Sequence, residues 1–109
     1  MSRIAEYITM QSRAASTYNN TYQTLGNALS APAVIAKIVN NGSVDLLIST
    51  DGTTDNDIIP ANSFCLYDLR TNRGDDEDDF MFRQGTQFYV KGAAAGTGTV
   101  YLVVIRERT

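Results

Sequence analysis

The sequence predicts a small all-β protein: an antiparallel β-sandwich, jelly-roll-like, with an extended N-terminal arm. Three observations lead to this fold class. The chain has 109 residues, the length of one domain. From about residue 25 onward, short β-branched and apolar runs alternate with turns rich in Gly, Asn and Asp. The gaps between these runs are too short for the helical crossovers that a parallel sheet requires.

Residues 1–24 differ from the rest because they are rich in Ser, Thr, Asn and Gln. Ile4, Tyr7 and Ile8 have helical spacing, which favours a short amphipathic helix near the start. Such a helix is marginal alone and needs a surface to dock on. Residues 11–24 have the character of an extended segment. We therefore expect an arm at residues 1–24 and a β-sandwich domain at residues 25–109.

The first predicted strand follows Pro32 and covers residues 33–39, which are mostly β-branched or small. It ends at the predicted turn Asn40-Asn41-Gly42, and a second run at 44–49 ends at Asp51-Gly52. Later strands are expected at residues 64–69, 87–91 and 99–106, with Phe80-Met81-Phe82 re-entering the fold after an acidic loop.

The last predicted strand is apolar on both faces. Across residues 99–105 the even-numbered side chains share one face and the odd-numbered ones share the other, and both sets contain large apolar residues. A two-layer domain has one interior, so the second face needs a cover. We expect the arm to pack on a neighbouring subunit, or a partner to cover this face. The predicted protein-interface residues are Ile4, Tyr7, Ile8, Met10, Tyr101, Val103 and Ile105.

Charge is concentrated in one loop. The formal net charge is −3, and the carboxylates of residues 75–79 carry −5, which leaves the rest of the chain at +2. The Lys and Arg residues are scattered, whereas nucleic-acid binding relies on clustered cations, so no nucleic-acid partner is expected. Residues 1–10 lack the apolar core of a signal peptide, and no run reaches the length of a membrane span. We expect synthesis in a cytoplasm and no membrane contact.

The side chains that most enzymes use are missing. With no His and one Cys, the chain cannot build a Ser-His-Asp triad, a Cys-His pair, a closed zinc site or an internal disulfide. Cys65 is interpreted as a buried small hydrophobe. Carboxylate pairs remain the one catalytic option, and nothing in the sequence fixes their geometry. The chain is therefore predicted not to be an enzyme.

Two acidic segments, 51–57 and 75–79, carry enough oxygen ligands for calcium. Neither has the order of an EF-hand loop. We interpret residues 51–57 as a turn and residues 75–79 as a solvated, self-repelling loop. The sequence thus predicts no metal and no cofactor.

Several turn and strand motifs together resemble small virion structural proteins of tailed bacteriophages. The resemblance covers residues 40–72 and 85–105 and contains no catalytic motif. The motifs are Asn40-Asn41-Gly42-Ser43-Val44-Asp45, Ile48-Ser49-Thr50-Asp51-Gly52, Ile59-Pro60-Ala61-Asn62, Tyr67-Asp68-Leu69, Gly85-Thr86-Gln87 and Gly98-Thr99-Val100-Tyr101.

This resemblance implies a structural place in a virion, with the major capsid protein or other virion subunits as partners and a homo-oligomeric state. The first hypothesis is a capsid decoration or cement protein that clamps neighbouring major capsid subunits. The second is a head-completion, tail or fibre-associated subunit. The third is a ligand-binding β-sandwich, such as a sugar-binding module, which predicts a monomer with a concave site lined by Tyr and Asp.

Overall fold

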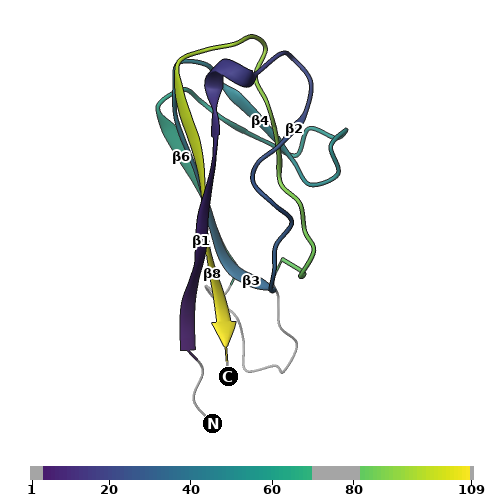
Figure 1. The fold of residues 1–109 in the computed structure, drawn as a ribbon, viewed down its shortest axis with the longest axis vertical. Helices are drawn as coiled ribbons and strands as arrows, with labels where there is room; N and C mark the ends of the chain where they lie inside the picture. The colour runs from purple at the N-terminus through teal and green to yellow at the C-terminus, as the bar shows by residue number, and fades with distance from the viewer. Residues whose placement is uncertain (1–3, 70–81, 109) are drawn as a thin grey trace.

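The computed structural model describes residues 4–69 and 82–108, which form two antiparallel four-stranded sheets packed as a sandwich (Figure 1). The sheets have the strand orders β1-β8-β3-β6 and β2-β7-β4-β5. A 3-10 turn, η1 (Ala15–Thr17), follows the first strand. The all-β sandwich predicted from the sequence is confirmed. The strands are β1 (Ile4–Ala14), β2 (Gln23–Thr24), β3 (Ala33–Gly42), β4 (Leu46–Ser49), β5 (Asp57–Ile59), β6 (Ser63–Asp68), β7 (Tyr89–Lys91) and β8 (Gly98–Arg108).

The strand order is that of a jelly roll. The antiparallel pairs β1·β8, β2·β7, β3·β6 and β4·β5 make the chain one long hairpin. The hairpin is rolled up, so that β8 also pairs with β3 and β7 also pairs with β4. Each sheet therefore takes strands from both halves of the chain, and β8 is hydrogen-bonded on both sides.

The core lies between the sheets and is built from alternate side chains. On β8, Val100, Leu102 and Val104 are buried, while the residues between them are only half-buried. The same alternation on β3 buries Ala36 and Ile38. The opposite sheet and its connections supply the rest. The largest fully buried apolar side chains are Phe88, Leu25, Ile38, Leu46, Ile48, Ile59, Leu102, Val90 and Val100.

Asn40 is a buried polar residue inside this core, and it corrects one predicted turn. Its side-chain amide donates to the carbonyl oxygens of Val44, Ile59 and Pro60 at 2.9, 3.0 and 3.1 Å. These hydrogen bonds allow the polar side chain of Asn40 to be buried within a strand. β3 therefore continues through residues 40–42, which are paired with β8 as far as Gly42. The sequence had placed a turn at these residues.

The prediction of a short helix around Ile4, Tyr7 and Ile8 is wrong. Residues 4–14 form β1, which pairs with β8 from Ile4 opposite Arg108 to Ala14 opposite Thr99, and the two strands lie side by side in Figure 1. A strand forms here because the backbone groups along the edge of β8 need hydrogen-bond partners, which a helix cannot supply.

Residues 4–24 do not form an arm that stands apart from the domain. Beyond the pairing of β1 with β8, Ala15 and Tyr18 are buried in the core, and β2 belongs to the second sheet. Residues 4–24 are thus part of the sandwich, so the predicted boundary at residue 25 marks a change in composition and not in packing. The acidic loop at 74–79 and most of the predicted re-entry at 80–82 lie outside the described residues; Phe82 forms an isolated bridge with Ala33.

Candidate protein-interaction face

The outer surface of the β1-β8-β3-β6 sheet carries rows of apolar side chains. Residues paired directly across strands point to the same side of a sheet, so the strand register defines each row. We call the set of side chains in these rows the outer face. The rows are Ser12, Tyr101, Val39 and Phe64; then Val103, Lys37 and Leu66; then Tyr7, Ile105, Ile35 and Asp68.

Large apolar side chains are exposed across the outer face. Tyr7 is 73% exposed, Phe64 61% and Leu66 53%. The apolar residues of β3 and β8 between them are half-buried, since their neighbours in the sheet cover their flanks. The sandwich core is filled from the other side of the same sheet. The outer face therefore remains an apolar surface exposed to solvent in the part of the chain that the structure describes.

Four of the seven predicted interface residues lie on the outer face: Tyr7, Tyr101, Val103 and Ile105. Met10 is 56% exposed and lies at an irregularity of β1, where residues 9 and 10 stand opposite Val103. The arm thus does not cover the second face of the last strand. It widens that face by one strand.

Ile4 and Ile8 lie elsewhere, because alternate residues of a strand point to opposite sides. Ile8 is opposite Val104, whose side chain is buried, and it packs against the core. Ile4 lies on the same side of β1, opposite Arg108. Neither contributes to the outer face.

The predicted interface missed Ile35, Val39, Phe64 and Leu66. A signal for them was present in the sequence, because Phe64-Cys65-Leu66-Tyr67 is apolar at every position, as the last strand is. In the structure, Cys65 and Tyr67 are partly buried and pack against the core, while Phe64 and Leu66 are exposed. What the sequence did not provide was the register that places β6 beside β3.

Lys37 lies in the middle row of the outer face, opposite Val103 on one side and Leu66 on the other. Among the described side chains of the three rows it is the cation and Asp68 is the anion, so the face is formally neutral. The methylene stem of a lysine covers apolar neighbours while its ammonium reaches water. A partner docking here must leave this ammonium hydrated or offer it an acceptor.

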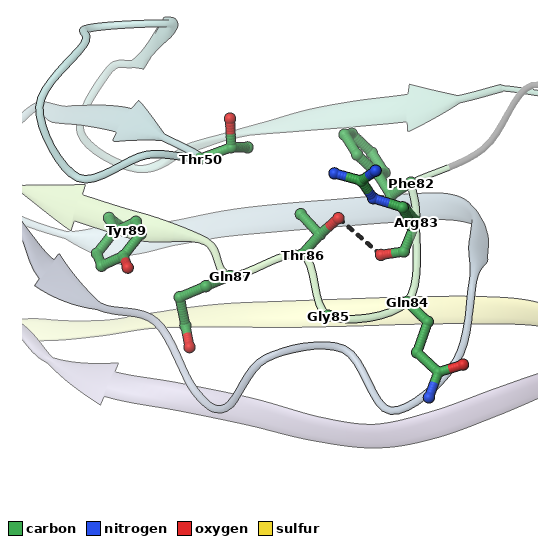
Figure 2. A pocket seen from close by; sticks show the side chains of 8 residues that line it. All are labelled: Thr50, Phe82, Arg83, Gln84, Gly85, Thr86, Gln87 and Tyr89. Carbon is green, nitrogen blue, oxygen red and sulfur yellow. Dashed lines mark hydrogen bonds between the residues drawn. The ribbon is translucent and has the colours of Figure 1, made fainter.

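A hollow of about 500 Å³ lies beside residues 82–89, away from the outer face. Its polar side chains do not converge. The Thr86 hydroxyl donates to the carbonyl of Arg83 at 2.7 Å, and the Gln87 amide donates to the carbonyls of Gly26 and Phe88, each at 3.0 Å. Figure 2 shows the side chains of Gln84 and Gln87 pointing away from Thr50. The lining includes Tyr89 but no Asp, whereas a site with both was expected for a ligand-binding module.

A smaller hollow of about 260 Å³ shares Thr50 and Phe82 with the first and contains Asp57 and Tyr67. The Tyr67 hydroxyl donates to Asp57 at 2.6 Å, and the Cys65 thiol donates to the same carboxylate oxygen at 3.3 Å. The Tyr67 bond holds the pKa of Asp57 below its usual value, while burial raises the pKa of Cys65 and that of Tyr67. The thiol and the phenol therefore stay protonated at neutral pH, so neither is an activated nucleophile.

The aspartates of residues 51–57 engage separate partners. Asp51 accepts hydrogen bonds from the backbone N–H groups of Thr53 and Thr54, both at 2.8 Å, and these bonds lower its pKa. Asp55 accepts from the Tyr22 hydroxyl and lies 3.6 Å from the Lys91 ammonium. Within residues 4–69 and 82–108, no three Asp, Glu or Cys side chains gather as metal ligands. The turn interpretation of residues 51–57 agrees with these bonds; residues 75–79 lie outside the described part.

Comparison with models of protein families, with curated protein sequences and with solved structures gave no match. Within the described ranges, no helix has the length and apolar character to cross a membrane.

Proposed function

We propose that this chain is a structural protein of a tailed-bacteriophage virion, and within that class a capsid decoration or cement protein that binds major capsid subunits and stabilises the head. The observation that carries the proposal is the outer face. Exposed apolar patches of more than a few hundred Å² on a soluble protein mark surfaces that contact other molecules. Here the patch is a continuous sheet face built on two of the longest strands, β3 and β8.

Two further points support an assembly role. Burial raises the pKa of the Cys65 thiol, and the neighbouring Asp57 accepts hydrogen bonds from Cys65 and Tyr67, so these three side chains are used in packing the sandwich. Jelly rolls also occur in viral capsid proteins, although a fold by itself does not determine function. In this proposal the protein is made in the host cytoplasm and then joins the virion.

The test is binding to phage heads that lack the protein. Purified full-length chain is mixed with such heads, sedimented, and located by negative-stain electron microscopy. Decoration of the shell, with heads that resist heating better, is the expected result. Density confined to the neck, tail or fibres would assign the chain to another structural role in the virion. No sedimentation with any particle component would contradict the proposal.

A second candidate is a sugar-binding module, and the one feature of the hollow beside residues 82–89 that favours it is the ring of Tyr89 in its lining. Tyr89 offers a half-buried aromatic ring, and Arg83 and Gln84 offer hydrogen-bond donors at its rim. Titration of the chain with glycan fragments of the host cell wall, followed by intrinsic tyrosine fluorescence, tests this candidate. Binding that is lost in Tyr89→Ala and kept in Leu66→Asp would favour the module over the shell protein.

A further inference from the structure

We propose that a second copy of this chain occupies the outer face, so that the protein is a two-fold dimer packed sheet on sheet through β1-β8-β3-β6. In this inference the outer face joins two copies of the chain, and other surfaces of the dimer meet the capsid subunits; its biological meaning rests on the proposed function. A two-fold dimer presents every remaining surface twice, which is what a clamp between two neighbouring capsid subunits requires. Dimerisation itself is measured on the chain alone.

The first argument is area. Aromatic side chains have surfaces of roughly 150–250 Å², so Tyr7 and Phe64, at 73% and 61% exposure, together leave on the order of 250 Å² uncovered. With Leu66, the half-buried residues between them and Met10, which stands beside the face opposite Val103, the exposed apolar surface is on the order of 600 Å². Two copies would bury on the order of 1,200 Å², the lower end of the range for specific protein interfaces.

The second argument is shape. Two sheets that pack face to face do so about 10 Å apart, with side chains from both faces interdigitating. The most exposed large apolar side chains of the outer face stand at its two edges, Tyr7 on β1 and Phe64 and Leu66 on β6. The side chains between them on β3 and β8, Tyr101 and Lys37 included, are half-buried. Exposed edge residues on both sides of a half-buried centre give a second sheet of the same kind apolar contacts across the whole width of the face.

The third argument is charge. A face of single sign would repel its own copy, whereas the described side chains of the three rows are formally neutral. Lys37 is the central charge, and no described residue forms an ion pair with it. In the dimer, aromatic rings such as that of Phe64 in the second copy provide acceptors for this ammonium through a cation–π contact. An acidic, charge-bearing partner is therefore not needed to accommodate Lys37.

A competing arrangement is edge pairing, because β1 and β6 are the two edges of this sheet. The two arrangements respond differently to substitution. Tyr7 lies on one edge strand and Leu66 on the other, so a face-to-face dimer contacts both. An edge dimer through β1 or through β6 contacts only one of them.

The experiment is sedimentation equilibrium of the full-length chain over a wide concentration range. The wild type is expected to dimerise with a dissociation constant on the order of 10 µM. Tyr7→Asp and Leu66→Asp should each weaken the dimer about 30-fold or more, because each replaces a large apolar contact with a carboxylate that the dimer would have to bury. The matched control is Ile58→Asp: Ile58 is 56% exposed on β5, an edge strand of the other sheet, and its substitution should leave the dimer unchanged.

Each outcome decides the proposal. A wild-type chain that stays monomeric at hundreds of micromolar overturns it, and so does a dimer that Ile58→Asp weakens as much as Leu66→Asp. Sensitivity to only one of the two outer-face substitutions assigns the dimer to a strand edge and also overturns it. Melting curves confirm that the variants are folded. Head binding by a strictly monomeric chain would leave the virion role standing while the dimer fails.

Discussion

The hydroxyl of Tyr67 on β6 donates a 2.6 Å hydrogen bond to the carboxylate of Asp57 on β5, and this bond joins an edge strand of one sheet to an edge strand of the other. The same carboxylate accepts the backbone N–H of Ile58 through its second oxygen at 2.8 Å. The Tyr67 bond is the main reason that the pKa of Asp57 lies below its usual value. Ionised Asp57 therefore stabilises the contact between the two sheets at the side of the sandwich where β5 and β6 are the edge strands.

The fold should lose this contribution in acid. Because the folded-state pKa of Asp57 is depressed, the unfolded chain binds the proton more readily, and the stabilisation is present above the unfolded pKa of about 3.9. It disappears as the pH falls through the folded pKa. We predict that the difference in free energy of unfolding between wild type and Asp57→Asn shrinks as the pH falls from 6 to 2. Urea unfolding at each pH measures it, and a difference independent of pH would contradict the prediction.

Gly98 and Gly85 form a matched pair for backbone strain. Both have positive φ, 95° and 93° respectively. A Cβ at Gly98 would lie 2.1 Å from the carbonyl oxygen of Asn41, whereas a Cβ at Gly85 meets nothing within 4 Å. We predict that Gly85→Ala costs about 1 kcal/mol through conformation alone, and that Gly98→Ala costs on the order of 3 kcal/mol or more because β3 must move. If thermal unfolding showed the same loss of stability for both variants, β3 would be able to move away from residue 98 at little cost.

Asn40 should tolerate no change of side chain. Asn40→Ala leaves up to three carbonyl oxygens without their amide donor, and we expect a loss of about 1–3 kcal/mol. Asn40→Asp should be worse, since it puts a buried carboxylate against carbonyl oxygens. Denaturant titration measures both variants. If Asn40→Asp matched the wild type at neutral pH, the amide would not be the donor that holds this end of the sandwich.

Calcium should not stabilise the protein. The carboxylates of Asp51, Asp55 and Asp57 are turned to different donors, so residues 51–57 offer no common site. We predict equal melting temperatures in millimolar calcium and in chelator. A rise of many degrees that chelator reverses would contradict this prediction. Repeating the scan with Asp51→Asn, Asp55→Asn and Asp57→Asn would then show whether the ion uses these residues.

Deleting residues 1–12 should destabilise the whole domain, contrary to what a separable arm implies. The deletion removes most of β1, leaves the edge of β8 unpaired and uncovers core side chains next to Ile8. We predict a fall in melting temperature of more than about 10 °C. The control is Tyr7→Ser, which keeps the strand and removes an exposed side chain, and which should stay within about 0.5 kcal/mol of wild type. A truncated chain as stable as the full one would mean that β1 is dispensable.

The sequence predicted the fold class because its signals are local. The alternation in residues 99–106 and the β-branched run at 33–39 correspond to β8 and β3. The wrong helix prediction also arose because sequence patterns report only on neighbouring residues. The spacing of Ile4, Tyr7 and Ile8 suits a helix only when the segment is considered alone, and the open edge of β8 overrides it through pairing with residues far along the chain.

The residues of the outer face were half predictable for a similar reason. Tyr101, Val103 and Ile105 are conspicuous because both faces of their strand are apolar, and a domain of this size has one interior. Phe64 and Leu66 join them only through the register of β6 against β3, and no single segment encodes that register. Alternation along the strand does not predict the side to which Met10 points, because the register of β1 shifts between Ile8 and Gln11.

The position of β8 in its sheet has a consequence for how the protein is made. β8 lies between β1 and β3 and comes last along the chain, so neither neighbour can pair with it until residues 98–108 have been synthesised. Contacts this distant in sequence form slowly, and β1 has no partner in the meantime. A chain that stops before β8 lacks the strand carrying Tyr101, Val103 and Ile105. A chain without residues 98–108 therefore cannot form the complete outer face.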